Sequence, residues 1–149
     1  SRKEAARFIA DYFERYRGVE AFMRRAIEEA KGGQGVRTLL GRRRLIRDIT
    51  SKNRVLRNMA ERIARNTPIQ GSAADILKLA MVRVQDRLER ERRGTRMLLT
   101  VHDELVFEVP ESEKEPIESL VKDEMQGAMR LKVPLVVDVG WGRSWADAH

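Results

Sequence analysis

The sequence predicts an α+β protein in which a helical, basic N-terminal part is followed by a part where antiparallel strands pack against helices. In the N-terminal part, apolar residues recur at spacings of three and four, as they do on one face of an amphipathic helix. Further along, two apolar runs of strand type, Leu98–Val101 and Leu105–Val109, are separated only by His102, Asp103 and Glu104. So short a break between such runs predicts a hairpin with a tight turn.

Charge is distributed unevenly along the 149 residues, whose formal net charge is +7. The first 70 residues hold 18 Lys and Arg against 8 Asp and Glu, a balance of +10, whereas the rest hold 12 against 15, a balance of −3. Arg is suited to bidentate contact with phosphate, so the N-terminal half is the expected surface for a polyanion. A basic surface that only keeps the protein in solution is the alternative.

Helices are predicted where the three and four spacing persists, and Ser1 and Glu4 form the Ser-x-x-Glu pattern of a capping box at the start of the first. Gly18 separates the first two helices, and Pro68 and Gly71 argue that a later pair is not one uninterrupted helix. The small residues that follow Gly71 indicate that another segment approaches closely there. The expected helical ranges are residues 1–16, 19–31, 52–65, 72–93 and 113–129.

Two segments of the basic part are candidates for contact with nucleic acid. Residues 36–46 predict a short hairpin or extended pair with three consecutive arginines, Arg42 to Arg44, at its tip. Such a tip is either a solvated loop or a clamp on a phosphate backbone, and the surrounding charge favours the clamp. Asn66 and Gln70 carry amides that can donate and accept hydrogen bonds at base edges in a minor groove, although amides near a helix start also serve as caps.

The turn between the two apolar strands lacks the Gly that such turns usually recruit. His and Asp tolerate left-handed backbone, so the turn is feasible but strained. Asp103 and Glu104 cannot both face the core, and hard oxygen ligands of this kind select Mg²⁺ or Mn²⁺. Together with phosphates on the basic surface, such a metal favours phosphoryl or nucleotidyl transfer. The alternative is that both are ordinary polar turn residues and that His102 caps the strand.

The C-terminal residues predict one more strand, and the composition excludes several kinds of site. A third strand is predicted over Val133–Gly140, with a polar tail anchored by Trp145, and the apolar hairpin strands are expected to be buried. The absence of Cys excludes a disulfide scaffold and thiolate metal sites, and His102 and His149 are too few for a Zn site. No apolar stretch approaches the roughly 18 residues of a membrane span, so we expect no membrane contact and a cytoplasmic location.

Several stretches, taken in order, resemble the C-terminal part of the bacterial family A DNA polymerases. The stretches are Arg65–Ile76 and Leu99–Glu108, with Ser1–Ala5, Tyr12–Tyr16, Thr38–Arg44 and Val133–Trp145. Ordered matches along the whole chain are far more specific than a His-Asp-Glu tripeptide, so they outweigh the interpretation of the tip as an ordinary turn. The resemblance implies that residues 1–65 are the C-terminal part of a fingers subdomain and residues 66–149 the C-terminal part of a palm, with its antiparallel sheet.

The same resemblance implies roles for single residues. Asp103 would be a catalytic, metal-binding aspartate, Glu104 an auxiliary carboxylate near Mg²⁺ or Mn²⁺, and His102 a neighbour of the primer terminus. The remaining residues implied to contact primer–template DNA are Arg62, Asn66 and Gln70 near the insertion site, and Arg42, Arg43 and Arg44 along the template.

Other parts of such a polymerase have no counterpart in these residues. They are the Asp-Tyr-Ser-type segment with the other catalytic aspartate, the fingers helix that binds the incoming nucleotide, the thumb and the exonuclease domains. We therefore expect that the isolated chain does not polymerise, and that dNTP is bound through an N-terminal remainder, in cis or as a separate polypeptide, in a bacterial, nucleoid-associated enzyme. The alternatives are a non-catalytic DNA-binding fragment or relic, and a protein-interaction domain, which needs an exposed apolar face.

Overall fold

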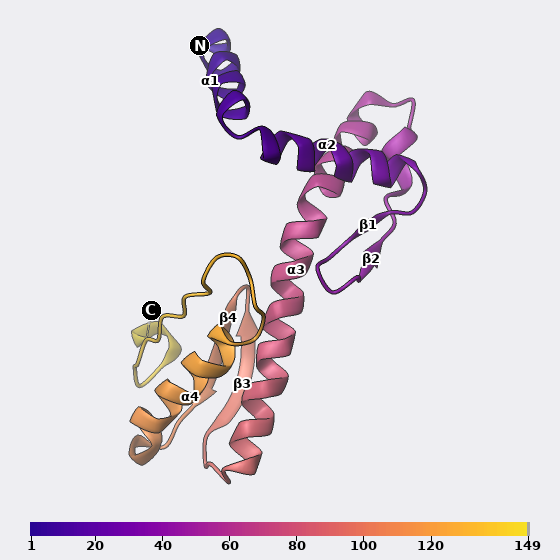
Figure 1. Cartoon of the computed structure of the whole chain (residues 1–149). Coiled ribbons are helices and arrows are strands. Elements are labelled where there is room, and N and C mark those ends of the chain that lie inside the picture. The colour runs from indigo at the N-terminus through magenta and orange to yellow at the C-terminus, as the bar shows by residue number, and fades with distance from the viewer. Residues whose placement is uncertain (149) are drawn as a thin grey trace. The chain divides into compact units, whose positions relative to one another are not determined.

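The computed structural model describes residues 1–148 and divides into two compact units, Ser1–Ser72 and the residues from Ala73 onward. Helices and two small antiparallel sheets build these units, which confirms the α+β class (Figure 1). The elements in chain order are α1 (Arg2–Arg15), α2 (Arg17–Lys31), β1 (Val36–Arg37), β2 (Arg43–Arg44), η1 (Arg47–Thr50), α3 (Arg54–Arg90), β3 (Arg96–Val101), β4 (Glu104–Glu108), η2 (Glu111–Glu113), α4 (Lys114–Gln126) and η3 (Trp145–Asp147).

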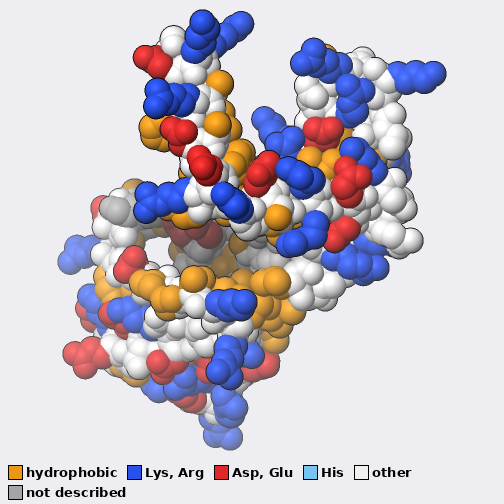
Figure 2. Space-filling model, turned by 45° about the horizontal axis from the view of Figure 1, so that its top comes forward, with side chains coloured by type: hydrophobic (Ala, Val, Ile, Leu, Met, Phe, Trp, Pro, Cys, Tyr) orange, Lys and Arg blue, Asp and Glu red, His pale blue; other side chains and the backbone are white. Residues whose placement is uncertain are grey.

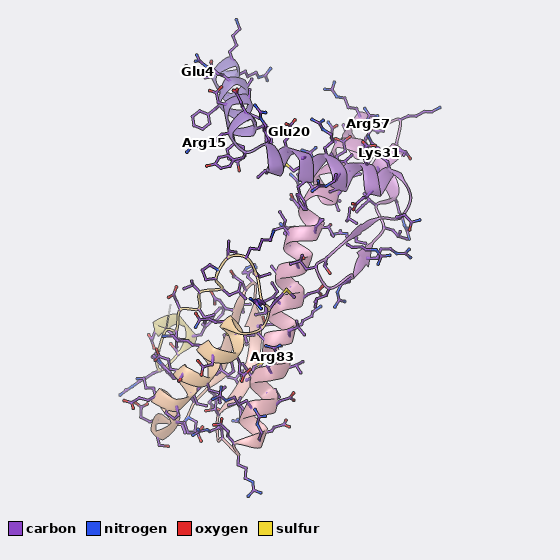
Figure 3. The ribbon with its side chains drawn as sticks, in the orientation of Figure 1. Glu4, Arg15, Glu20, Lys31, Arg57 and Arg83 are labelled. Atoms are coloured by element: carbon purple, nitrogen blue, oxygen red, sulfur yellow. The ribbon has the colours of Figure 1, made fainter. Side chains whose placement is uncertain are left out.

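The first unit has a small core made by α2, the β1–β2 hairpin, η1 and the first part of α3. The predicted capping box begins α1, because the Ser1 hydroxyl accepts a hydrogen bond from the Glu4 N–H at 3.3 Å. α1 ends and α2 begins around Tyr16, two residues before the expected break at Gly18. Ion pairs occupy the exposed side of α2, where Glu20 and Lys31 are labelled in Figure 3. The buried core residues are Ala26, Ala30, Val36, Ile46, Ile49, Ala60 and Ala64.

The helix α3 runs without interruption through Pro68, so the prediction of two separate helices is wrong. Pro removes one helical hydrogen bond, but packing on both sides of it outweighs this local preference. Ala64 is fully buried before the proline, and Ser72 is 5% exposed after it. The hydroxyl of Ser72 donates to the carbonyl of Pro68 itself, which ties the two parts of the helix together.

The first hairpin forms as predicted, but its arginines do not sit at the tip. β1 pairs with β2 in the register Val36↔Arg44 and Arg37↔Arg43. The turn is made by the preceding residues, because Gly41 supplies the left-handed conformation at φ 80°. Arg43 and Arg44 therefore lie on the returning strand, with Arg42 just before it.

The second unit packs the β3–β4 hairpin and α4 against the later part of α3 (Figure 1). The apolar residues of α3 and α4 recur at helical spacing, so each helix turns one apolar face to this core. The helix predicted over residues 113–129 is observed over 114–126. Pro116 lies in its first turn, where its missing N–H costs no helical hydrogen bond. The core residues are Val84, Leu88, Ile117, Leu120 and Val121, with Met97, Phe107, Val109 and Met125 packed against them.

Two expectations for the strands are wrong. Val133–Gly140 forms no strand: the two sheets described over residues 1–148 pair only β1 with β2 and β3 with β4, and Val133 and Val136 are exposed. The hairpin is not buried on both faces either: Leu98 is 54% and Leu99 is 46% exposed. Only the face that carries Met97 and Phe107 is covered by the core.

Trp141 fastens the C-terminal segment to α4. The Trp141 indole Nε1 donates to the Glu118 carboxylate at 3.0 Å, and the Lys114 ammonium lies 5.2 Å from the centre of its ring. Trp145 is 47% exposed. Within residues 1–148, no helix combines the length and apolar character that a membrane crossing demands.

Glu113 fastens the connection between α3 and β3. Its carboxylate accepts hydrogen bonds from the Gly94 N–H at 2.8 Å, the Thr95 N–H at 3.0 Å and the Thr95 hydroxyl at 2.7 Å. The hydrogen bond from the Thr95 hydroxyl contributes most to lowering the pKa of Glu113 below its ordinary value. Gly94, the Thr95 N–H and the charge of Arg93 also lower this pKa, and burial opposes them.

We predict that Glu113→Gln lowers the free energy of unfolding at neutral pH and that its effect fades in acid. A carboxyl whose pKa is lower in the folded than in the unfolded protein stabilises the fold where it is ionised, and this stabilisation is lost as the pH falls through the folded-state pKa. Urea unfolding of both proteins over a pH series measures the difference. A difference that stays constant into acid would contradict this account.

Arg92 ends α3 in the left-handed conformation, at φ 52°. The Arg93 N–H donates to the Leu88 carbonyl at 2.9 Å and the Arg92 N–H to the Glu89 carbonyl at 3.0 Å, which is the Schellman pattern of helix ends. This position usually belongs to Gly, because a side chain at positive φ is strained.

We predict that Arg92→Gly raises the free energy of unfolding by up to about 1 kcal/mol, because it removes the cost of left-handed backbone. Lys78→Gly is the control, since Lys78 is exposed inside α3, where a change to Gly should cost about 1 kcal/mol. Chemical denaturation of the three proteins tests both signs, and a loss of stability in Arg92→Gly would refute the strain at this position.

Candidate functional site

The predicted turn of the β3–β4 hairpin is present and uses left-handed backbone at His102, with φ 53°. The strands pair in an antiparallel register down to Val101↔Glu104, so His102 and Asp103 alone form the turn. A turn this tight requires positive φ, which Asn, Asp and His tolerate better than most residues. The strain expected from the sequence is thus located at one residue.

The two predicted carboxylates occupy different surroundings at this turn. Asp103 is exposed at the tip, whereas Glu104 is half-buried as the first residue of β4. Both present hard oxygen donors, and Mg²⁺ sites commonly use one or two protein carboxylates and complete the shell with waters and substrate phosphates. The donor set therefore fits a divalent cation shared with a phosphate substrate. Among residues 1–148, no cluster of three or more such ligands is assembled.

A separate groove of about 300 Å³ lies in the first unit and is lined by four of the predicted DNA-binding residues. Arg62, Asn66 and Gln70 follow one another at four-residue spacing, so they share one face of α3. All three side chains are exposed to solvent. The groove lining consists of Arg44, Arg62, Ile63, Asn66, Thr67 and Gln70.

Arg44 reaches this groove from β2. Its Nη1 donates to the Thr67 hydroxyl at 3.4 Å, and that hydroxyl donates in turn to the Ile63 carbonyl at 2.8 Å. The guanidinium is thereby held beside the amides of Asn66 and Gln70. The two guanidinium groups and the two amides of the lining offer donors for phosphate and for base-edge acceptors.

The structure does not bring all predicted residues into the groove. Arg42 and Arg43 are exposed on the hairpin but do not line it. His102, Asp103 and Glu104 belong to the second unit, and each unit is described by itself. The sequence predicts a basic N-terminal surface, and Figure 2 shows Lys and Arg side chains spread over the visible face, with apolar side chains exposed between them.

Two groove residues, Ile63 and Thr67, are absent from the sequence prediction. A signal for them existed, because residues 63 and 67 lie next to 62, 66 and 70 on the same helical face once α3 is continuous. Pro68 concealed this signal, since it argued for a helix boundary inside the segment.

A second hollow, of about 380 Å³, lies in the second unit between β4, α4 and the C-terminal segment. Phe107, Val109 and Trp141 supply apolar and aromatic walls, and Lys114 lies over the indole. The nearby Lys122 ammonium, followed by the Trp141 N–H, lowers the pKa of Glu118 below its ordinary value. These contacts hold the C-terminal segment on α4.

The chain is similar to bacterial DNA polymerases over almost its whole length. It is 53% identical over 148 residues to DNA polymerase I of Bacillus caldotenax, and 50% identical over 148 residues to DNA polymerase I of Bacillus subtilis. Each match covers 99% of this chain and 17% of the relative. The chain thus spans about a sixth of the length of these curated relatives.

A solved structure agrees with this likeness. It is described as the POL domain of Pol1 from M. smegmatis in complex with DNA primer-template and dNTP, and it is 46% identical to this chain with a TM-score of 0.93. The match covers 99% of this chain and 26% of that one. The model of the DNA polymerase family A matches residues 1–147. The chain belongs to the family A DNA polymerases.

Proposed function

We propose that this chain is the C-terminal fingers and palm portion of a DNA-directed DNA polymerase, residues 1–65 and 66–149, which catalyses template-directed nucleotidyl transfer together with an N-terminal remainder. The observation that carries the proposal is the likeness, at 46% identity and a TM-score of 0.93, to a polymerase domain whose structure contains primer-template DNA and dNTP. Because the relatives are bacterial, we propose that the protein acts on the DNA of the bacterial nucleoid.

The groove of the first unit would contact the primer–template duplex. Base pairs of all sequences present acceptors in the minor groove, so the Asn66 and Gln70 amides can donate to them without reading the sequence. Arg62 and Arg44 add positive charge to the same groove, while Arg42 and Arg43 would follow the template backbone. A polymerase must hold every sequence equally, which is what such contacts allow.

The hairpin tip of the second unit would serve the reaction itself. Asp103, with Glu104 beside it, would hold Mg²⁺ or Mn²⁺, and His102 would lie near the primer terminus. A pair of bound divalent ions stabilises the charge that develops on the attacking and leaving oxygens of phosphoryl transfer. Asp103 is exposed at the end of the two-stranded ribbon, so its carboxylate would be open to substrate phosphates.

We predict that Asp103→Asn abolishes primer extension, with a loss of at least about 100-fold, because the amide cannot replace a charged ligand. Extension of a primed template is measured with the chain and the remainder of the polymerase supplied together. Asp86→Asn is the matched control, as Asp86 is an exposed aspartate of α3. Activity kept by the Asp103 variant would leave DNA binding without chemistry as the function of this chain.

The 149-residue chain alone is expected not to extend a primer, because the resemblance implies that the other catalytic aspartate lies in an Asp-Tyr-Ser-type segment with no counterpart in these residues. The same extension assay, run with and without the remainder of the polymerase, tests this. Incorporation of dNTP by the isolated chain would contradict the proposal that the metal site is shared with that remainder.

We also predict that substitutions in the groove separate charge from hydrogen bonding. Arg62→Ala should weaken binding of a primed duplex and reduce the slope of log affinity against log salt by about 0.9, because one phosphate contact is lost. Gln70→Ala should weaken binding by about 1 kcal/mol or more with the slope unchanged, because its amide is neutral. Fluorescence anisotropy over a salt series measures both, with Arg90→Ala on the far part of α3 as the control.

A further inference from the structure

The turn of the β1–β2 hairpin rests on α3 through a buried hydroxyl. The Leu39 N–H donates to the Ser72 Oγ at 2.9 Å, and the Ser72 hydroxyl donates to the Pro68 carbonyl. Ser72 is 5% and Thr38 is 8% exposed. The side chains of Leu39 and Leu40 point into solvent, 66% and 51% exposed, so apolar burial does not hold this turn. The contact with Ser72 is therefore a specific attachment point.

Gly71 allows the turn to approach this closely. A Cβ added at Gly71 would lie 2.7 Å from the Thr38 Cγ2, closer than carbon atoms can pack. Gly71 lies inside α3, where Gly is intrinsically unfavourable, so the reason for Gly here is the approach of the hairpin. Of the small residues after Gly71 that predicted a close neighbour, Ser72 meets the hairpin, whereas Ala73 and Ala74 are exposed.

Hydrogen bonds across the turn connect this attachment to the strand that carries Arg44. Thr38 bonds across the turn, because its N–H donates to the Arg42 carbonyl at 3.0 Å and its Oγ1 accepts from the Arg42 N–H at 3.1 Å. Two residues later, Arg44 pairs with Val36, which is fully buried in the core of the first unit. Arg44 then reaches the groove through its hydrogen bond to Thr67.

We propose that Gly71 and Ser72 are positioning residues for DNA binding, which act by holding the β1–β2 hairpin on α3 so that Arg44 lies in the groove. This inference rests on the proposed function of the groove and adds residues outside its lining. The hairpin is seated at one end by Val36 in the core and at the other by Thr38 and Leu39 on α3. Loss of the attachment of Thr38 and Leu39 to α3 would let β2, with Arg44, move. The face of α3 that carries Asn66 and Gln70 would stay in place.

The experiment measures binding of a primed DNA duplex to the full 149-residue chain by fluorescence anisotropy over a salt series. Arg44→Ala is expected to weaken binding about tenfold and to reduce the salt slope by about 0.9, because it removes a charged contact. Gly71→Ala and Ser72→Ala are expected to weaken binding and to reduce the salt slope by as much as Arg44→Ala or by less. In the Arg44→Ala background, neither should cause further loss, because they act through Arg44.

Conservative variants distinguish positioning from damage to the fold. Thr38→Ser removes the Cγ2 that the methyl group introduced by Gly71→Ala would meet, and it keeps the hydroxyl that Arg42 needs, so it should restore binding to Gly71→Ala. Ser72→Thr keeps the hydroxyl and should bind like the parent chain, unlike Ser72→Ala. Gly18→Ala is the control for a new helix methyl, because nothing lies within 4 Å of the added Cβ.

The outcomes separate this inference from the proposed function. If Arg62→Ala weakens DNA binding but Gly71→Ala and Ser72→Ala do not, or if their losses add fully to that of Arg44→Ala, the inference is overturned and the groove stands. If the unsubstituted chain does not bind DNA, or if neither Arg62→Ala nor Arg44→Ala weakens binding, both this inference and the proposed DNA contact of the groove are overturned. If Gly71→Ala fails to fold, the Thr38→Ser combination and the pair Ser72→Ala and Ser72→Thr decide the question.

Discussion

One constraint shapes both units: α3 must supply a buried face to each of two cores over a single run from Arg54 to Arg90. Its first part buries Ala60 and Ala64, and its last part buries Val84 and Leu88. Between these anchors the helix passes through a proline because packing on either side outweighs the lost hydrogen bond. In its first part, Arg62, Asn66 and Gln70 of the groove lie on the side of α3 turned away from buried Ala60 and Ala64, so the packing of these alanines sets the direction of the groove residues.

The sequence predicts those features that depend on near neighbours in the chain. The capping box at Ser1 and the left-handed turn at His102 follow from residue type and spacing. The resemblance to family A polymerases implies contact with DNA for Arg62, Asn66 and Gln70, and these three residues line one groove. What failed depended on distant contacts. A proline tolerated by tertiary packing cannot be recognised locally, and Val133–Gly140 has the composition of a strand without a paired neighbour among the described residues.

Because the two cores are small, many large apolar side chains remain exposed. Phe8 on α1 is 81% exposed, and Leu98 on β3 and Val136 in the C-terminal segment are 54% and 75% exposed. Proteins seldom leave many such side chains in water unless another surface covers them. The curated relatives are about six times as long as this chain, which fits the proposal that it works together with further polymerase structure.

The left-handed backbone at His102 has a consequence for protein engineering. Arg92 and His102 have almost the same φ, 52° and 53°, so a search for stabilising substitutions that ranks residues by backbone strain would choose both. They differ in what the strain accomplishes. At Arg92 it only closes a helix, whereas at His102 it sets the turn that carries Asp103 and, on the proposed function, places an imidazole at the primer end. A variant library designed to raise thermal stability should therefore vary position 92 and keep His102 unchanged.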